Sequence, residues 1–443
     1  MEQTGFIGKI LKFFKVEERG STLSKEVIGG LTTFLAMAYI LGVNPSILAS
    51  EGTGMDFGAA FTATAIAAIF GTLVMGLLAN LPIALAPGMG LNAFFTYTVV
   101  FGLGYSWQQA LIGVLISGIL FFLLSITGVR KKVINAIPKD LKLAVGAGIG
   151  LFIAYVGLQG AGIIVTSATI SGLGDLTSPE VLLAVAGLLI TVVLFLKKVP
   201  GAILIGIIST MVLGLIFGAV KWNGFVSMPS APPIFELFDG FSNGVWDLKF
   251  IAVVFSLLFV DFFDTTGTIV SVGKQAGLMN EEGELVNDKQ ALLADASATI
   301  VGALVGTSST TAYIESLSGV EAGAKTGLAN VVTALLFMLA LFLSPLFGMV
   351  AGFCTAPALI FVGILMSKQL QEIDWQDNVF AITSFLVIIM MPLTYSIATG
   401  LAIGFIFYPV TMIASKRTKE VNPVMYILML FFIAYFVVNT LVF

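Results

Sequence analysis

Apolar runs of about 20 residues, separated by short polar segments, follow one another along almost the entire chain. A run of this length is sufficient for an α-helix to cross the hydrocarbon core of a bilayer. A helix is stable there because it satisfies its own backbone hydrogen bonds. A transmembrane β-barrel would instead show short segments of alternating polarity. The pattern therefore predicts an all-α polytopic membrane protein.

The runs predict fourteen spans in two sets of seven, divided by a longer polar loop around Pro232. The first set is predicted at about 24–43, 57–79, 83–101, 107–127, 139–160, 180–196 and 199–220. The second set is predicted at about 250–271, 289–306, 310–323, 326–344, 349–367, 377–391 and 395–414. One further apolar segment, 424–442, closes the chain.

Composition and charge agree with this pattern and add an orientation. The chain is 58% hydrophobic and only 10% charged, whereas a soluble domain carries about 25% charged residues. With the segment 1–23 in the cytoplasm, every Lys and Arg except Lys221 and Lys249 falls on the cytoplasmic side, as the positive-inside rule requires. We therefore expect a multi-pass plasma-membrane protein with cytoplasmic loops near Lys132, Lys198 and Arg417 and an external loop near Pro232. The charges do not decide whether 424–442 also spans.

Two predicted spans contain residues that interrupt a helix. The third carries Pro82 and Pro87, which lack a backbone donor, together with Gly88 and Gly90. We expect its first part to be extended and only Asn92 onward to be helical. The tenth carries the polar run 307–311 before a short helix near 312–324. Non-helical backbone at membrane depth occurs only where it lines a cavity or is buried in protein.

The two interrupted spans are the third members of their sets of seven. Because seven is odd, the two sets have opposite orientations in the membrane. Such an arrangement is typical of inverted-repeat secondary transporters, in which the broken helices mark the binding site. Two half-helix N-termini would then meet near the midplane, where their N–H groups favour an anionic or carbonyl-bearing ligand.

Carboxylates are rare in these spans and are therefore functional candidates. Asp261 and Asp264 are three residues apart, so they share one face of a helix. Two carboxylates this close resist double ionisation, so one of them could hold a proton at neutral pH. Alternatively, Asp264 braces a neighbouring half-helix through Thr265 or Thr266.

Three further polar residues lie in the third, ninth and tenth predicted spans. Glu315 stands at the start of the short helix of the tenth span, where a negative charge is favoured; it either contacts ligand or caps that helix. Asn92 has the corresponding place in the third span, and its donor and acceptor suit the edge of a heterocycle, unless it only caps. Asp295 either pairs with Lys274, bonds to Ser or Thr groups, or takes part in proton coupling.

Several kinds of chemistry are excluded or weakly indicated. The chain has no histidine and one cysteine, Cys354, so the usual metal ligands and proton relay are missing. Gly172-Leu173-Gly174-Asp175 matches an intramembrane aspartyl protease pattern but lies in a predicted loop. The glycines at 146, 148 and 150 are better explained by close helix packing than by dinucleotide binding. We expect no enzyme, no metal, no cofactor beyond a coupling proton, and no nucleic-acid partner.

Four stretches resemble a known family. They are Glu26-Val27-Ile28-Gly29-Gly30-Leu31-Thr32-Thr33-Phe34, Ala86-Pro87-Gly88-Met89-Gly90-Leu91-Asn92-Ala93-Phe94-Phe95, Asp261-Phe262-Phe263-Asp264-Thr265-Thr266-Gly267-Thr268 and Thr310-Thr311-Ala312-Tyr313-Ile314-Glu315-Ser316. They resemble the nucleobase–cation symporter (nucleobase–ascorbate transporter) superfamily, which includes uracil and xanthine permeases. The chain is most similar to its AzgA-like branch of hypoxanthine, guanine and adenine permeases.

The resemblance implies a uracil-permease-like fold of fourteen spans in two inverted repeats. It implies a core domain (24–127 and 250–344) and a gate domain (139–220 and 349–414) that carries a homodimer contact, with 424–442 as an extra segment. Transport would be an elevator-like movement of core against gate, driven by protons. The histidine that uracil-permease relatives use is absent here.

The resemblance also implies a set of site residues. Asp261, Glu315 and Asn92 would contact the base, and we add Gly90, Thr311 and Ala312 to the predicted binding set. Asp264, Asp295 and Thr265 are predicted to couple protons or brace the site.

The leading hypothesis is a purine:proton symporter that imports hypoxanthine and guanine, with an adenine permease of the same branch as an alternative. An anion transporter of the same fold would need a cation in the tenth span, where this chain has Glu315. A membrane-embedded aspartyl hydrolase would need Asp261 and a second Asp on facing helices.

Overall fold

The computed structural model describes residues 6–127, 136–166, 171–244, 247–280 and 285–441. The predicted loop around Lys132 and both extreme termini lie outside these residues. In the described part, eight helices are long and apolar enough to cross a membrane. They are Leu23–Leu48, Phe57–Ala79, Trp107–Thr127, Lys139–Gly160, Pro179–Leu196, Gly327–Gly348, Gly352–Glu372 and Ile397–Ala414. Four shorter apolar helices are Met89–Gly102, Ala202–Ile216, Asn378–Leu393 and Pro423–Ala434.

Where the structure describes it, the first half of the chain consists of helices and three short strands. Its elements are α1 (Phe6–Phe13), α2 (Leu23–Met37), α3 (Ile40–Leu48), α4 (Phe57–Val74), the π-helix η1 (Met75–Ala79), β1 (Leu85–Pro87), α5 (Met89–Ala93), the π-helix η2 (Phe94–Gly102), α6 (Trp107–Thr127), α8 (Lys139–Gly160), β2 (Ile164–Val165), β3 (Gly172–Leu173), α9 (Pro179–Leu196) and α10 (Ala202–Ile216).

The described residues of the second half repeat this mixture of long helices with one short strand. Its elements are η3 (Glu236–Asn243), α11 (Leu248–Gln275), α12 (Asp288–Val305), β4 (Thr310–Ala312), α13 (Ser316–Glu321), α14 (Gly327–Ala340), η4 (Leu341–Leu343), α15 (Ser344–Gly348), α16 (Gly352–Met366), η5 (Ser367–Glu372), α17 (Asn378–Leu393), α18 (Ile397–Ala414), η6 (Thr418–Glu420) and α19 (Pro423–Leu441).

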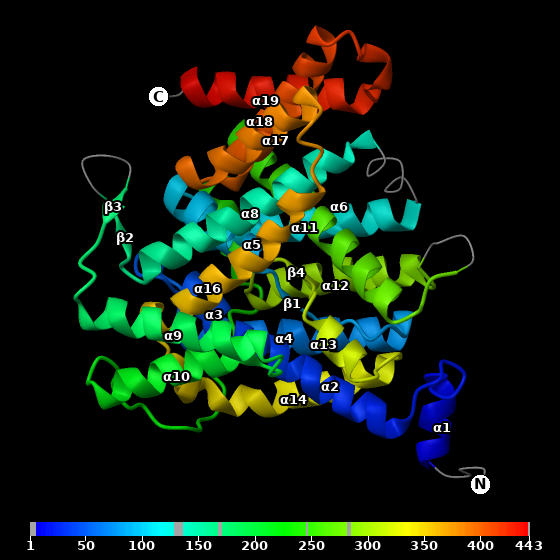
Figure 1. The fold of residues 1–443 in the computed structure, drawn as a ribbon, viewed down its shortest axis with the longest axis vertical. Coiled ribbons are helices and arrows are strands. Elements are labelled where there is room, and N and C mark those ends of the chain that lie inside the picture. The colour runs from blue at the N-terminus through cyan, green and yellow to red at the C-terminus, as the bar shows by residue number, and fades with distance from the viewer. Residues whose placement is uncertain (1–5, 128–135, 167–170, 245–246, 281–284, 442–443) are drawn as a thin grey trace.

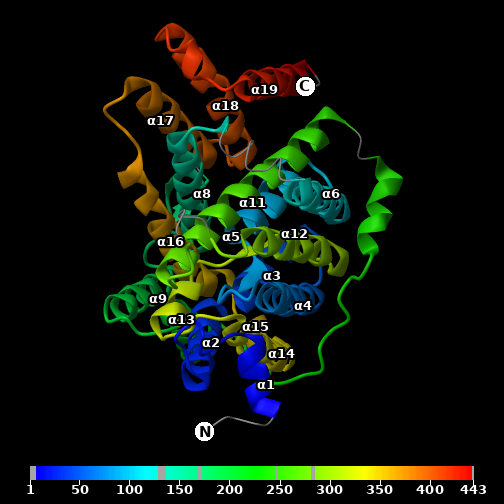
Figure 2. The same cartoon turned by 90° about the vertical axis from the view of Figure 1, so that its right-hand side faces the viewer.

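Strands β1 and β4 pair at the centre of the molecule (Figure 1). The pairing is antiparallel and sets Leu85 opposite Ala312 and Pro87 opposite Thr310. Figure 2 shows the surrounding helices, with α4, α12 and α6 viewed nearly end-on. Because every residue of both strands is buried, their backbone groups need partners in the protein, and the pairing supplies them. Two segments more than 200 residues apart are thus joined at the level of the site.

Three element boundaries differ from the sequence-based expectation. Helix α5 begins at Met89 rather than Asn92, because Gly88 takes an extended conformation immediately before it and Asn92 N–H already bonds to Gly88 O at 2.9 Å. Helix α13 begins only at Ser316 and ends at Glu321, because strand pairing holds 310–312 extended. The predicted span 24–43 is two helices, α2 and α3, with Tyr39 at the break.

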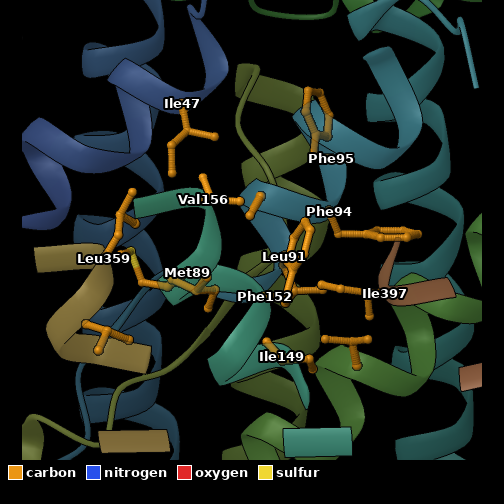
Figure 3. Packing of buried hydrophobic residues seen from close by; sticks show 14 of the residues in the cluster. Ile47, Met89, Leu91, Phe94, Phe95, Ile149, Phe152, Val156, Leu359 and Ile397 are labelled. Carbon is orange, nitrogen blue, oxygen red and sulfur yellow. The ribbon is translucent and has the colours of Figure 1, made fainter. Parts of the chain in front are cut away.

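Helix α8 packs closely against α16 and α17 through its glycines. A Cβ on Gly150 would lie 2.6 Å from Met366 Cβ, and one on Gly148 would lie 2.7 Å from Met391 Sδ. This confirms that these glycines permit close helix packing. Figure 3 shows the adjoining apolar cluster, which includes Leu91 and Phe94 together with Ile149 and Phe152 of α8.

The C-terminal helix α19 packs against α11 and α18. Its Phe432 ring stacks on Phe405 of α18 at 5.4 Å, and Phe431 lies 4.9 Å from Phe255 of α11. The predicted extra segment 424–442 is therefore helical as far as residue 441, and it packs through Phe431 and Phe432.

Candidate functional site

Asp261 lies on α11 where this helix passes strand β4. It is 1% exposed. Its Oδ2 lies 3.2 Å from Thr299 Oγ1 of α12, which shares its one hydroxyl hydrogen with Thr310 O at 2.8 Å. Asp261 Oδ1 is buried and has no hydrogen-bond partner among the described residues. A buried acceptor without a partner is costly, so Asp261 offers an open acceptor for a ligand or a proton.

Thr265, one turn after Asp261 on α11, connects three elements. Its Oγ1 donates to Asp295 Oδ2 of α12 at 2.9 Å and lies 2.8 Å from Thr311 Oγ1 of β4. Asp295 is fully buried. Of the alternatives open for Asp295, the structure shows the bond to a threonine. Thr265 and Asp295 therefore brace β4 beside Asp261, and Thr311 belongs to the same network.

Glu315 immediately precedes α13 and bonds to a residue that sequence reasoning did not single out. Tyr39 Oη, from the break between α2 and α3, donates to Glu315 Oε1 at 2.6 Å. Tyr39 is buried and Glu315 half-buried. The Glu315 side chain makes no capping bond to α13, so the capping alternative is not observed. A tyrosine inside an apolar run carries no sequence signal that identifies its partner.

Asn92 lies within α5, which has no side-chain cap; the capping role is therefore not observed for Asn92 either. Its Nδ2 donates to Asn44 Oδ1 of α3 at 3.0 Å. Asn44 Nδ2 in turn lies 2.7 Å from Thr64 Oγ1 and 2.9 Å from Thr307 Oγ1. Asn92 Oδ1 is buried and lacks a partner within the described ranges. Asn44 was also missed, because an isolated asparagine in an apolar run is not informative alone.

The remaining predicted residues lie around this centre. Asp264 is half-buried on α11. The hydrogen bonds that connect this part of α11 to α12 and β4 come from Thr265. Gly90 faces α8, where an added Cβ would lie 2.6 Å from Ile149 Cγ2, so packing is enough to explain this glycine. Ala312 is buried and is the last residue of β4.

The site is therefore rich in hydrogen-bond acceptors. In the part of the chain that the structure describes, no Lys or Arg forms an ion pair with Asp261, Asp264 or Glu315. Asp261 contacts the hydroxyl of Thr299, and Glu315 contacts the hydroxyl of Tyr39. Chemically, such a cluster suits a neutral ligand with several N–H groups, together with a proton.

Residues 24–403 match the permease family. The chain belongs to this family. As a permease it is a membrane transport protein and not an enzyme, and the apolar helices make it a multi-pass one.

Named relatives resemble this permease over nearly its full length. It is 52% identical to the guanine/hypoxanthine permease PbuG of Bacillus subtilis (strain 168), over 96% of this chain and 99% of the relative. It is 44% identical to the adenine permease AdeP of Escherichia coli (strain K12), over 97% of this chain and 96% of the relative.

Solved structures of transporters share the fold of this permease. The transmembrane domain of the cyanobacterial bicarbonate transporter BicA matches with a TM-score of 0.60 at 14% identity, over 86% of this chain and 97% of that chain. The murine Slc26a9 anion transporter, in its inward-facing state, matches with a TM-score of 0.64 at 13% identity, over 93% and 73%.

Proposed function

We propose that this permease imports purine nucleobases, above all hypoxanthine and guanine, by proton symport. The observation that carries the proposal is the pair of buried acceptors without partners, Asp261 Oδ1 and Asn92 Oδ1, in a site that also contains Glu315. A planar purine offers ring N–H groups that can satisfy such acceptors. The guanine/hypoxanthine and adenine permeases among its relatives support the same ligand class.

We also propose the architecture in which this site works. It has fourteen spans in two inverted repeats, with the core domain at 24–127 and 250–344 and the gate domain at 139–220 and 349–414. The antiparallel pairing of β1 with β4, one strand from the third span of each set, supports this arrangement. The core moves against the gate as an elevator. Two copies associate through the gate domain in the plasma membrane, with the N-terminus in the cytoplasm.

The test is uptake of radiolabelled guanine by cells or proteoliposomes that contain the permease. Unlabelled hypoxanthine, guanine, adenine, xanthine and uracil compete for uptake, and sulfate and bicarbonate serve as controls. We expect hypoxanthine and guanine to compete best and the two anions not to compete. If adenine competed best, the preferred substrate would be adenine rather than hypoxanthine and guanine. Transport of the anions without any purine uptake would refute the proposal.

A further inference from the structure

Thr64 determines which groups around Asn44 donate and which accept hydrogen bonds. A hydroxyl carries one donor hydrogen, and Thr64 Oγ1 donates it to the backbone oxygen of Ala60 at 2.6 Å. Only the lone pairs of Thr64 Oγ1 remain for Asn44, which lies 2.7 Å away. Asn44 must therefore present its NH₂ group, and not its carbonyl oxygen, to Thr64.

The orientation of Asn44 sets the orientation of Asn92. With its NH₂ group between Thr64 and Thr307, Asn44 directs Oδ1 toward Asn92. An amide oxygen only accepts hydrogen bonds, so Asn92 presents its own NH₂ group at 3.0 Å. A reversed Asn92 would place two carbonyl oxygens in contact, and both asparagines are buried away from water.

Asn92 Oδ1 is consequently the end of the amide that faces away from Asn44. It is buried and has no partner among the residues described here. An asparagine free to rotate could offer a ligand either a donor or an acceptor. This one is held so that it offers an acceptor.

We propose that Asn44 is a positioning residue that holds Asn92 as an acceptor, so that this part of the site takes an N–H edge of the base. The inference rests on the proposed function and narrows it. With Asp261 Oδ1 also open, two open acceptors are available to N–H groups of the ligand. Bases with several N–H groups, such as guanine, fit this arrangement, whereas a ligand edge composed only of carbonyl oxygens or ring nitrogens does not.

A double-mutant cycle on the purified full-length permease tests the inference. Guanine affinity is measured for the wild type, Asn44→Leu, Asn92→Leu and the double variant. We expect Asn44→Leu to weaken binding about tenfold in the wild-type background, because the Asn92 amide is then free to reverse. In the Asn92→Leu background, the same change should weaken guanine binding by less than about twofold. A general structural defect would cost the same in both backgrounds.

A milder pair of variants covers the case in which Asn44→Leu does not fold. Thr64→Val removes the acceptor that sets the direction of the network and should weaken guanine binding about threefold. Thr62→Val is the matched control, because Thr62 is on the same helix, equally buried, and its hydroxyl has no partner among the described residues. This control should bind as the wild type does.

Two results would overturn this inference but not the proposed function. One is an equal loss from Asn44→Leu in both backgrounds; the other is indistinguishable affinity of Thr64→Val and Thr62→Val. In either case the wild type would still bind guanine, and the proposed function would stand. A wild type that binds none of guanine, hypoxanthine and adenine would instead refute the proposed function, and the inference with it.

Discussion

Tyr39 donates a hydrogen bond of 2.6 Å to Glu315 Oε1 across a sequence separation of 276 residues. The bond joins the break between α2 and α3 to the residue that precedes α13. It holds Oε1 of a half-buried carboxylate. The break in the first span therefore contributes a residue that contacts Glu315.

Tyr39→Phe should weaken guanine binding about tenfold, because the Glu315 carboxylate loses its charge-assisted donor. Equilibrium binding to the purified protein measures the effect. Tyr408→Phe is the control, since Tyr408 is a buried tyrosine on α18 away from the site. Equal affinities for both variants would show that the Tyr39 hydroxyl has no role in binding.

Glu315→Gln should cost about 2–4 kcal/mol of binding free energy, because a charge-assisted acceptor becomes a group with a misplaced donor. Membrane expression should be unchanged. Glu321→Gln at the other end of α13 is the matched control, since Glu321 is exposed. Normal guanine affinity of the Glu315 variant would remove this residue from the site.

Proton coupling should reside in the Asp261, Asp264 and Glu315 cluster as one shared titration. Substrate binding and proton binding then favour each other by linkage. A low external pH fills the shared proton site, so uptake should fall as external pH rises and should collapse with a protonophore. Asp264→Asn should weaken the pH dependence of uptake more than guanine binding.

The coupling prediction has a clear contrary outcome. Uptake that follows a sodium gradient and ignores the protonophore would make the cluster a cation site instead. Glu236→Gln serves as the control for Asp264→Asn, because Glu236 is an exposed acid in η3; its pH profile should match that of the wild type.

Glu26→Gln should destabilise the protein without changing guanine affinity. The buried Glu26 carboxylate accepts backbone N–H bonds from Lys325, Thr326 and Ala329 at 2.9, 3.3 and 3.3 Å, at the start of α14. The negative charge is favoured by the helix N-terminus, so the variant should lose about 1–3 kcal/mol. Thermal unfolding in detergent measures this against Glu18→Gln, an exposed control. An unchanged Tm would contradict the capping role.

The proposed orientation predicts which side of the membrane each loop faces. After replacement of Cys354, a cysteine at Pro232 should react with an impermeant thiol reagent in intact cells. A cysteine at Lys198 should react only after the membrane is opened. Labelling of the Lys198 position in intact cells would reverse the predicted topology.

The sequence alone determined the class of protein and the residues of interest. Spans follow from runs of apolar residues, because a bilayer requires about 20 of them in succession. Carboxylates such as Asp261 and Glu315 are conspicuous there because membrane charge is costly. Asn92 is indicated by its place in the interrupted third span, and the family motifs predicted a nucleobase ligand. All of these signals are local in the chain, so no tertiary contact is needed to find them.

Tertiary structure decided how those residues are connected. The start of α5 at Met89, the pairing of β1 with β4 and the break at Tyr39 depend on packing between distant segments. The same holds for the bond from Tyr39 to Glu315, and for the chain from Thr64 through Asn44 that leaves Asn92 Oδ1 open. A side-chain hydrogen bond depends on two atoms lying about 3 Å apart at a suitable angle. Sequence spacing cannot specify that for residues that approach only when the chain has folded.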